Sequence, residues 1–487
     1  MAASSWVHLG RSEPVHTVSN AYAEPVTQAL VGLLEMQLGS AVISDRPEHG
    51  VQRSVAQIPH VHGGLAMPDS NDLLFAAFLG GFLNTVAFYR QQKLNANQVY
   101  PLWIHAAVEG MLEPSQHGGP YERSVLRAHQ VFIQIFVGVN DREPTLLEDG
   151  FDMSISSLVP FAFKFQAKAA ALAVALKKKH LLSVLTPAQA KTLESGSSIT
   201  AAAMCRALPT TDLSDIPNQI YIRVMNRRLL NQNLAAVVLG DVCPRKGCQQ
   251  KEPMQIAELS SHVEGCILGG SHTTVRHDYV LKIVKDMAKA AGAVVSPLSP
   301  TLDPVIQSQL RAAAATSGIA LPLTRFGMVK GGDLTVKFTG ELPLVLDVRV
   351  PIETVAKYKS VPSAVNKAES DKRSLYSVLY KGIGYQFEGI AVDPAGRLGD
   401  GLLQLIEKCG KKANPDLLWA LPGITYVTPT FSSYWSQRIV LAAQRANAEI
   451  LMDVSEKLAH NRSYAPEPTR GSGAGNRLNH RPATRQL

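Results

Sequence analysis

The sequence has little charge and few aromatic residues, and it has none of the common nucleotide-binding or hydrolase loops. Charged residues make up 18% and aromatic residues 6% of its 487 positions, whereas the apolar fraction of 46% is ordinary for a globular protein. No GxxxxGK[ST] loop, GxGxxG loop or nucleophile elbow is present, which argues against P-loop, Rossmann and α/β-hydrolase enzymes. The length is enough for two to four domains.

We also expect no segment that directs the chain to or across a membrane. Residues 1–6 lack a basic region and no apolar run follows them, so we expect no signal peptide. The most apolar segment, 158–176, is interrupted by Lys164 and Lys168 and is followed by three lysines. This pattern favours a packed, alanine-rich helix over a membrane span. We expect a nuclear or cytoplasmic protein with no membrane contact.

Acidic residues are outnumbered by basic ones. The net charge is +8 and the isoelectric point is about 9.1. This balance favours a polyanionic partner such as nucleic acid, although a metabolic enzyme can also be this basic.

Cysteine is scarce, but three of the five cysteines lie close together with a histidine. The pattern is Cys243-x4-Cys248-x13-His262-x3-Cys266, and four such ligands suit a tetrahedral Zn²⁺. A site with four protein ligands has no open position, so this zinc would be structural. Chance clustering is the alternative, and His272 or His277 could replace a ligand. Cys205 and Cys409 are isolated, and we expect them to be buried.

The first half of the chain has a helical pattern. Apolar residues recur at spacings of three and four in 26–38, 73–88, 123–138, 157–187 and 216–238. Residues suited to N-caps precede several of these segments: Asp69, Ser70, Asp72 and Thr186. The pattern stops at 239–271, where cysteine, glycine, proline and polar residues replace it, and a helix is predicted again over 272–292.

Two strands predicted downstream each carry an aspartate. Segment 333–338 alternates apolar and polar residues, and segment 344–350 is apolar except at Asp347 and Arg349. A turn at Gly340–Glu341 would pair the two as a hairpin in which the numbers of facing residues sum to about 681. Asp347 would then lie across from Leu334, one step from Asp333. Two such carboxylates repel each other unless a divalent cation bridges them. The alternative is an Asp347–Arg349 ion pair with Asp333 in a turn.

A helix predicted over 362–381 places Lys372 in its apolar stripe, with Tyr376 one turn later. The lysine either extends to the rim of the helix or reaches a site on the sheet, where it could stabilise phosphate charge. Lys357, Lys359 and Arg373 belong to a basic cluster over 349–381. This cluster, and the pair Arg276–His277, can be read as phosphate contacts or as a solvated surface.

The expected fold class is therefore a multidomain α+β or α/β protein. A helical region over 1–238 precedes a zinc knuckle over 239–271 and a small mixed-sheet domain over 272–430. A third strand is expected at 385–393 and helices at 399–409 and 433–459. The domains end with a C-terminal helix over 431–460 and a disordered basic tail over 461–487.

The order of these segments resembles the C-terminal region of non-LTR retrotransposon polyproteins, downstream of the reverse transcriptase core. Segments 58–67 (IPHVHGGLAM) and 76–80 (AAFLG) look like the family's "LP…GGLG…AAFLGS" stretch. Segment 216–230 is similar to the helix before its zinc knuckle, and the Cys/His cluster with Arg276-His277-Asp278 is similar to the knuckle and the helix start after it.

The strands and the next helix resemble the family's restriction-endonuclease-like domain, of the PD-(D/E)xK type. The resemblance implies that Asp333 and Asp347 hold Mg²⁺ and that Lys372 or Arg349 assists water in attacking a phosphodiester bond. The chain departs from the pattern at Gly332-Asp333, where Pro-Asp is usual, and at Arg349, where many such nucleases carry lysine.

The polymerase motif [FY]-x-D-D is absent, so the chain resembles a detached tail that does not copy nucleic acid. The expected function is DNA nicking, with DNA as the partner and RNA as a further candidate. Two alternatives are a non-catalytic nucleic-acid-binding remnant and an assembly protein built on the helical half.

Overall fold

The structure is a computed structural model, and it describes most of the chain outside its two ends and several internal segments. The described residues are 24–38, 50–67, 70–91, 120–198, 200–207, 215–230, 262, 264, 272–296, 299–318, 320–324, 326–353, 356–359, 361–415, 421, 424–425 and 428–463.

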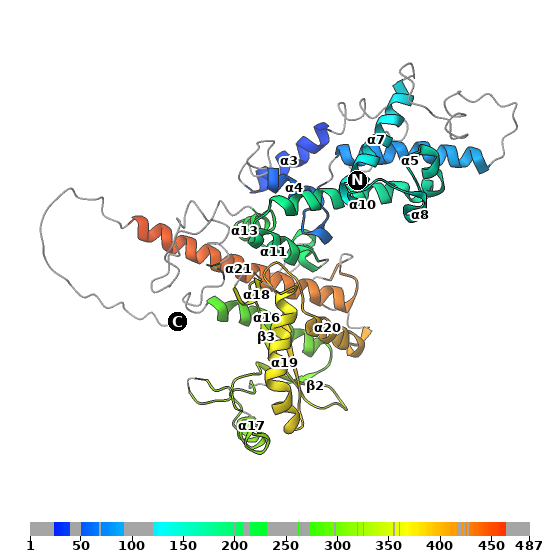
Figure 1. The fold of residues 1–487 in the computed structure, drawn as a ribbon. Coiled ribbons are helices and arrows are strands. Elements are labelled where there is room, and N and C mark those ends of the chain that lie inside the picture. Colours follow the sequence, from blue (N-terminus) through cyan, green and yellow to red (C-terminus); the bar gives the residue numbers. More distant parts are fainter. Residues whose placement is uncertain are drawn as a thin grey trace, which may run out of the picture.

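The described N-terminal half is helical (Figure 1). Its longer helices are α3 (Glu24–Leu38), α4 (Gly50–Gln57), α5 (Ser70–Gln91), α7 (Pro120–Asn140), α10 (Ala162–Val184), α11 (Pro187–Gly196) and α13 (Asn218–Arg228). Short turns connect them: η3 (His60–His62), α8 (Leu146–Asp149), α9 (Ile155–Leu158), η4 (Val159–Phe161), η5 (Thr200–Ala202) and α12 (Ala203–Arg206). The helical pattern of the sequence is thus confirmed for the described residues, and positions 231–238 of the predicted segment 216–238 lie outside them.

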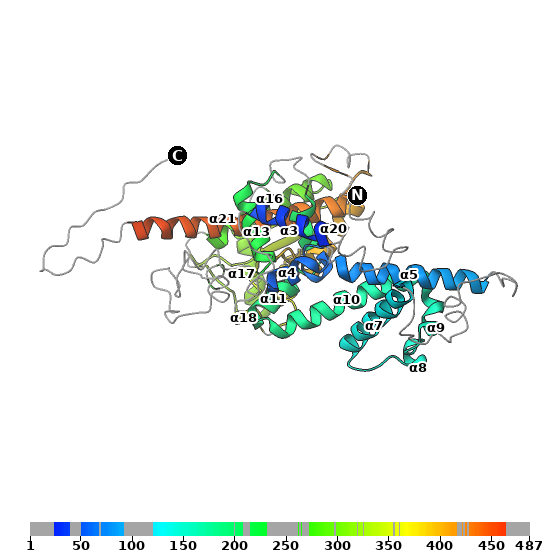
Figure 2. The same cartoon turned by 90° about the horizontal axis from the view of Figure 1, so that it is seen from above.

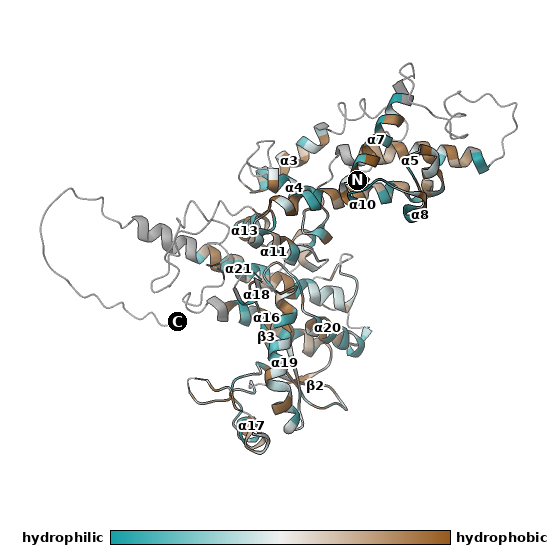
Figure 3. Ribbon diagram, in the orientation of Figure 1, coloured by the Kyte–Doolittle hydropathy of each residue, from teal (hydrophilic) through white to brown (hydrophobic). Residues whose placement is uncertain are grey.

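Helices α5, α7 and α10 form a layer of their own, seen from above in Figure 2. Phe132 lies at its centre, with ring centroids of Phe151 and Phe165 at 5.7 and 4.8 Å. Apolar residues run along α5 and α10 in Figure 3. Within the described residues, the stretch Ile155–Val184 is long and apolar enough to cross a membrane by length and composition. Of its most apolar window, 33% is buried, and the buried residues pack on α5 and α7.

The second half contains a four-stranded mixed sheet in the order β1-β2-β3-β4. Its elements are α16 (His272–Ala290), β1 (Val294–Val295), α17 (Pro304–Ser317), β2 (Leu334–Lys337), β3 (Leu344–Arg349), α18 (Ala356–Lys359), α19 (Ala364–Gly382), β4 (Gln386–Ala391), α20 (Asp400–Lys412) and α21 (Phe431–Ser463). Strands β1, β2 and β3 are antiparallel neighbours, and β4 runs parallel to β3 after the crossover helix α19. The expected small mixed sheet is confirmed.

Strand β3 is buried on both faces because helices cover both. Leu346 and Val348 join the core formed with α16, α20 and α21, whereas Val345 packs against Tyr376 and Tyr380 of α19. Side chains alternate along a strand, so Asp347 faces α19 together with Val345. This placement puts a carboxylate inside the layer between sheet and helix.

The register of the β2–β3 hairpin differs by one residue from the prediction. Leu334 pairs with Leu346, so residue numbers sum to 680 instead of 681. The turn centres on Gly340, whose φ of +77° suits glycine, and the Glu341 N–H closes it on Phe338 O at 3.1 Å. Continued by one residue, this register places Asp333 directly opposite Asp347.

One of the apolar clusters crosses the predicted domain boundaries. Helix α21 lies between α13 of the helical half and α16 of the sheet half (Figure 1). A single apolar cluster joins Val224, Val280, Leu346 and Ile439. Parts of the segments predicted as 1–238, 272–430 and 431–460 therefore bury apolar side chains against one another.

Local signals account for several helix ends. Thr186 caps α11 with a reciprocal capping box to Gln189, as the sequence predicts. Asp303 caps α17, a helix that the sequence pattern missed because it lies in a Pro-rich stretch. The predicted knuckle at 239–271 lies outside the described residues except for positions 262 and 264, and residues 464–487 of the predicted tail also lie outside them.

Candidate functional site

A cavity of about 460 Å³ lies where the β2–β3 hairpin meets α19. Its polar and aromatic lining comes from five segments far apart in the sequence: His277, Lys330, Asp333, Asp347, Arg349, Lys357, Tyr358, Asp371, Lys372 and Tyr376. All four side chains predicted to be catalytic, Asp333, Asp347, Lys372 and Arg349, are in this set.

Asp347 is the most buried acid of the cavity, at 3% exposure. Its Oδ2 accepts from Lys372 Nζ at 2.8 Å and from the Gly332 N–H at 3.2 Å. Burial and the nearby charge of Asp333 raise the pKa of Asp347, against the opposing effect of Lys372. Lys372 therefore reaches into the site, and Asp347 pairs with it rather than with Arg349.

Asp333 lies at the point where the ladder between β2 and β3 ends. Its N–H still donates to Leu346 O at 2.7 Å, but its carboxylate Oδ2 accepts from the Val348 N–H, also at 2.7 Å. The side chain thus takes the place of a backbone acceptor. This bond holds the carboxylate against β3 and turns it toward the cavity.

His277 of α16 is the second partner of Asp333. Its Nε2 lies 2.9 Å from Asp333 Oδ2, and its Nδ1 lies 2.9 Å from Asp278 Oδ1. Burial lowers the pKa of His277, but the bonds to Asp333 and Asp278 and their charges outweigh it and raise the pKa to about 9. His277 is therefore a cation at neutral pH, and it holds Asp333 as an ion pair.

Two glycines allow the backbone to approach the carboxylates. Gly331 and Gly332 have φ of +105° and +86°, and a Cβ at Gly331 would lie 2.5 Å from the Tyr376 ring. A proline at 332, expected from the resemblance, would have no N–H for Asp347 and could not adopt this φ. Glycine at position 332, where the family has proline, is thus required by the backbone conformation and by the hydrogen bond to Asp347.

Lys372 also lies over the Tyr376 ring, with Nζ 5.2 Å from the centroid. Burial and the charge of Asp347 raise the pKa of Tyr376 to about 12, so this phenol stays protonated at neutral pH. The tyrosine is a neutral wall of the cavity that restricts where Lys372 can lie.

The residues predicted to contact nucleic acid are dispersed. Arg276 is 2% exposed and donates to Asn447 Oδ1 at 2.9 Å, so this side chain faces the protein interior and α21. Neighbouring positions on a helix face different directions, and the buried side of α16 includes Arg276. Lys357 lines the cavity, and Arg373 pairs with Glu388 on β4. The Lys359 side chain lies outside the described residues.

The two aspartates have the donor chemistry that suits Mg²⁺. The bonds given above fall on Oδ2 of both side chains, which leaves each Oδ1 for another ligand. Mg²⁺ usually takes one or two carboxylates and completes its coordination with waters and substrate phosphates. Among the residues that the structure describes, no group of three or more His, Cys, Asp or Glu side chains is arranged around a metal position. A two-carboxylate site therefore fits only a metal that shares its coordination with substrate.

The predicted zinc ligands Cys243, Cys248 and Cys266 lie outside the described residues, and only His262 is within them. The isolated Cys409 is buried, as expected, and Cys205 is partly buried.

Comparison with models of known protein families finds no match, and comparison with curated proteins finds no similar sequence. The case for a function therefore depends on the residues of this chain.

Proposed function

We propose that this chain is a metal-dependent DNA endonuclease, the nuclease tail of a retroelement protein, that hydrolyses a phosphodiester bond in the cavity between the hairpin and α19. One observation carries the proposal: Asp333, Asp347 and Lys372, singled out by strand and helix periodicity and given catalytic roles by the resemblance, line the same cavity. A cavity with three acids, two of them adjacent on the hairpin, and several cations is suited to a metal ion and a phosphate together.

Asp333 and Asp347 would hold Mg²⁺, which supplies a Lewis acid for phosphate oxygens and a more acidic water when bound. Lys372 Nζ, already held at the carboxylate of Asp347, is positioned to donate to a phosphate oxygen as negative charge develops there. Arg349 and Lys357 line the same cavity and would bind the phosphates on either side of the cleaved bond.

A structural zinc at Cys243, Cys248, His262 and Cys266 belongs to the same proposal. The ion would fold the segment around 239–271, which has too few apolar residues for a core. Elemental analysis of protein purified without chelator should give one zinc per chain, and a metal-free preparation would refute this part.

Nucleic-acid binding without cleavage is the second candidate. The pairs Lys372–Asp347 and His277–Asp333 balance both carboxylates with protein cations. Because these ion pairs neutralise the carboxylates without a metal, the basic surface would bind nucleic acid without cleaving it.

A plasmid-nicking assay with Mg²⁺ separates the two functions. Asp347→Asn should abolish nicking while DNA affinity stays the same or rises slightly, because a negative charge is removed. Glu341→Gln is the matched control: Glu341 lies at the other end of the same hairpin, paired with Lys408 and Lys412, and its loss should leave nicking unchanged. A wild-type protein that binds DNA with a steep salt dependence but never nicks it supports the second candidate.

A further inference from the structure

One wall of the cavity is a short strap between β3 and α19, here defined as residues 350–353, 356–359 and 361–363. Lys357 and Tyr358 of this strap line the cavity. Tyr358 packs on Val365 and Ala368 of α19, and Lys357 Nζ lies 2.8 Å from Asp371 Oδ2. The middle of the strap is thus held on α19, while its two ends contact helices α13 and α11.

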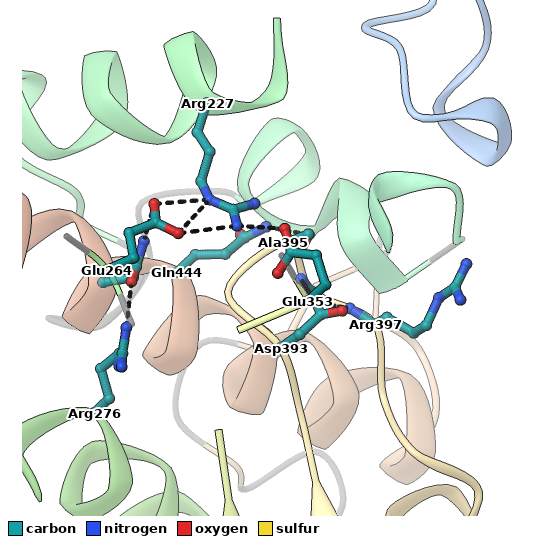
Figure 4. Close-up of polar contacts among 10 residues, drawn as sticks. Arg227, Glu264, Arg276, Glu353, Asp393, Ala395, Arg397 and Gln444 are labelled. Carbon is teal, nitrogen blue, oxygen red and sulfur yellow. Dashed lines mark hydrogen bonds and ion pairs between the residues drawn. The ribbon is translucent and has the colours of Figure 1, made fainter. Parts of the chain in front are cut away.

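The first end is anchored on the helical half by a buried ion pair (Figure 4). Arg227 of α13 donates through Nη2 to Glu353 Oε1 at 2.6 Å and through Nε to Glu264 Oε1 at 3.0 Å. Glu353 is fully buried, so its charge depends on this arginine. The charges of Glu264 and Glu353 outweigh burial and raise the pKa of Arg227, which keeps it charged.

The second end is anchored on the same half by another cation. Lys191 of α11 donates through Nζ to the Val361 carbonyl and, at 3.5 Å, to the Pro362 carbonyl. Val361 packs beside Tyr358 in the small apolar cluster on α19. Two basic side chains of the helical half therefore fix the chain on both sides of Lys357 and Tyr358.

We propose that Lys191 and Arg227 are positioning residues of the nuclease site. The helical half holds the strap at both ends and so sets where Lys357 and Tyr358 meet the substrate. This inference rests on the proposed function for its catalytic consequence, but the anchoring itself can be measured without any activity. The helical half then helps to position the site through the strap, although it supplies no residue to the cavity lining described above.

Hydrogen exchange of the full chain tests the anchoring, with Lys191→Met and the double variant Lys191→Met/Glu353→Gln. Backbone amides of the strap should exchange about tenfold faster in the double variant, while those of 334–349 keep their wild-type rate. Lys191→Arg should restore slow exchange because it keeps the cation. Lys179→Met is the control, since Lys179 also donates to two backbone carbonyls, those of Gly138 and Val139, within the helical half.

Nicking kinetics supply the second readout. The KM for DNA should rise several-fold in the double variant with kcat within about threefold of wild type, because the strap contributes binding rather than the metal site. Unchanged exchange of the strap in the double variant would overturn the inference whatever the kinetics show. Faster exchange in a protein whose wild type never nicks DNA would refute the proposed nuclease and leave the anchoring supported.

Discussion

The layer of α5, α7 and α10 and the region around the sheet bury very different side chains. The layer is filled with phenylalanine, alanine and aliphatic residues, and His129 is its buried titratable group among the described residues. Burial lowers the pKa of His129 to about 4, so it is neutral. The sheet region and its junction bury carboxylates instead: Glu264, Asp347, Glu353, Glu369 and Asp393.

The difference indicates where chemistry is expected. An apolar layer needs only shape and volume, whereas each buried carboxylate must be compensated by hydrogen bonds or a cation. Glu369, for example, accepts from the N–H groups of Ala391, Gly401 and Leu402 and so caps α20 from a neighbouring helix. Stability in the layer should thus be separable from activity, and the two should be linked near the sheet.

The largest expected effect is on the stability of the layer. Phe132→Ala removes a ring that is 1% exposed, so the free energy of unfolding should fall by about 3–5 kcal/mol. Nicking per folded molecule should not change. Chemical denaturation and nicking under native conditions measure the two effects. Phe163→Ala, at an exposed position of the same layer, should change neither stability nor nicking. If Phe132→Ala lost more nicking than its unfolded fraction explains, stability and activity would not be separable in the layer.

A matched pair of lysines tests activity. Lys372→Met removes the cation from Asp347 and should reduce nicking about 100-fold, the scale seen when one donor to developing charge is lost. Lys168→Met removes a cation 4.6 Å from the rings of Phe151 and Phe161 in the layer, and nicking should stay within about twofold of wild type. Equal losses in both variants would show that the two regions are not distinct.

The pH dependence of stability should have opposite signs in the two regions. Burial and the charge of Glu353 raise the pKa of Asp393 from 3.8 to about 7. Its contribution to stability is present below pH 3.8 and is lost as pH rises to about 7, because the unfolded chain releases this proton first. Asp393→Asn should therefore stabilise the protein by roughly 2 kcal/mol at pH 8 and have little effect at pH 4.

Asp149 of the helical half has the opposite pKa shift to Asp393. The hydrogen bond from Arg142 lowers the pKa of Asp149, so its contribution is present above its ordinary pKa and is lost as pH falls. Asp149→Asn should weaken the protein slightly at pH 8. Thermal unfolding of both variants from about pH 2 to pH 8 measures the comparison, because the contribution of Asp149 is lost only below its ordinary pKa of 3.8. A pH dependence of the same sign in both variants would contradict it.

The smallest expected effect concerns the helix that joins the two regions. Thr186→Ala removes the capping box of α11, the helix that carries Lys191, and should cost about 1 kcal/mol. Ser183→Ala, at an exposed position just before it, should cost less. Urea denaturation separates these variants, and equal midpoints would show that the cap contributes nothing measurable.

Much of the site follows from spacing along the chain. The period of two and the helical stripe place Asp347 on a strand and Lys372 on a helix, and Asp333 lies directly before β2. The register was one residue off because the pattern gives the hairpin but not the φ of Gly340 that centres its turn. Periodicity describes one element at a time.

The contacts between distant elements could not be predicted. His277 meets Asp333 across 56 positions, and Arg227 meets Glu353 across 126. Neither pair leaves a local pattern. The burial of Arg276 did leave one, since Arg276, Val280 and Met287 follow helical spacing on the buried side of α16. The sequence analysis grouped Arg276 with its sequence neighbour His277 instead of with its helical stripe, and so did not anticipate its burial.

The position of α21 has a consequence for how the protein is made. Gln444 on this helix donates to the carbonyls of Ala201 and Ala395, so it joins backbone that a ribosome produces 243 and 49 residues earlier. The layer of α5, α7 and α10 can close as soon as α10 has emerged, because its contacts lie within one stretch of chain. The junction must wait for residues near 444. During synthesis, Arg227 therefore leaves the ribosome 126 residues before its buried partner Glu353, with Glu264 as the partner that is made first.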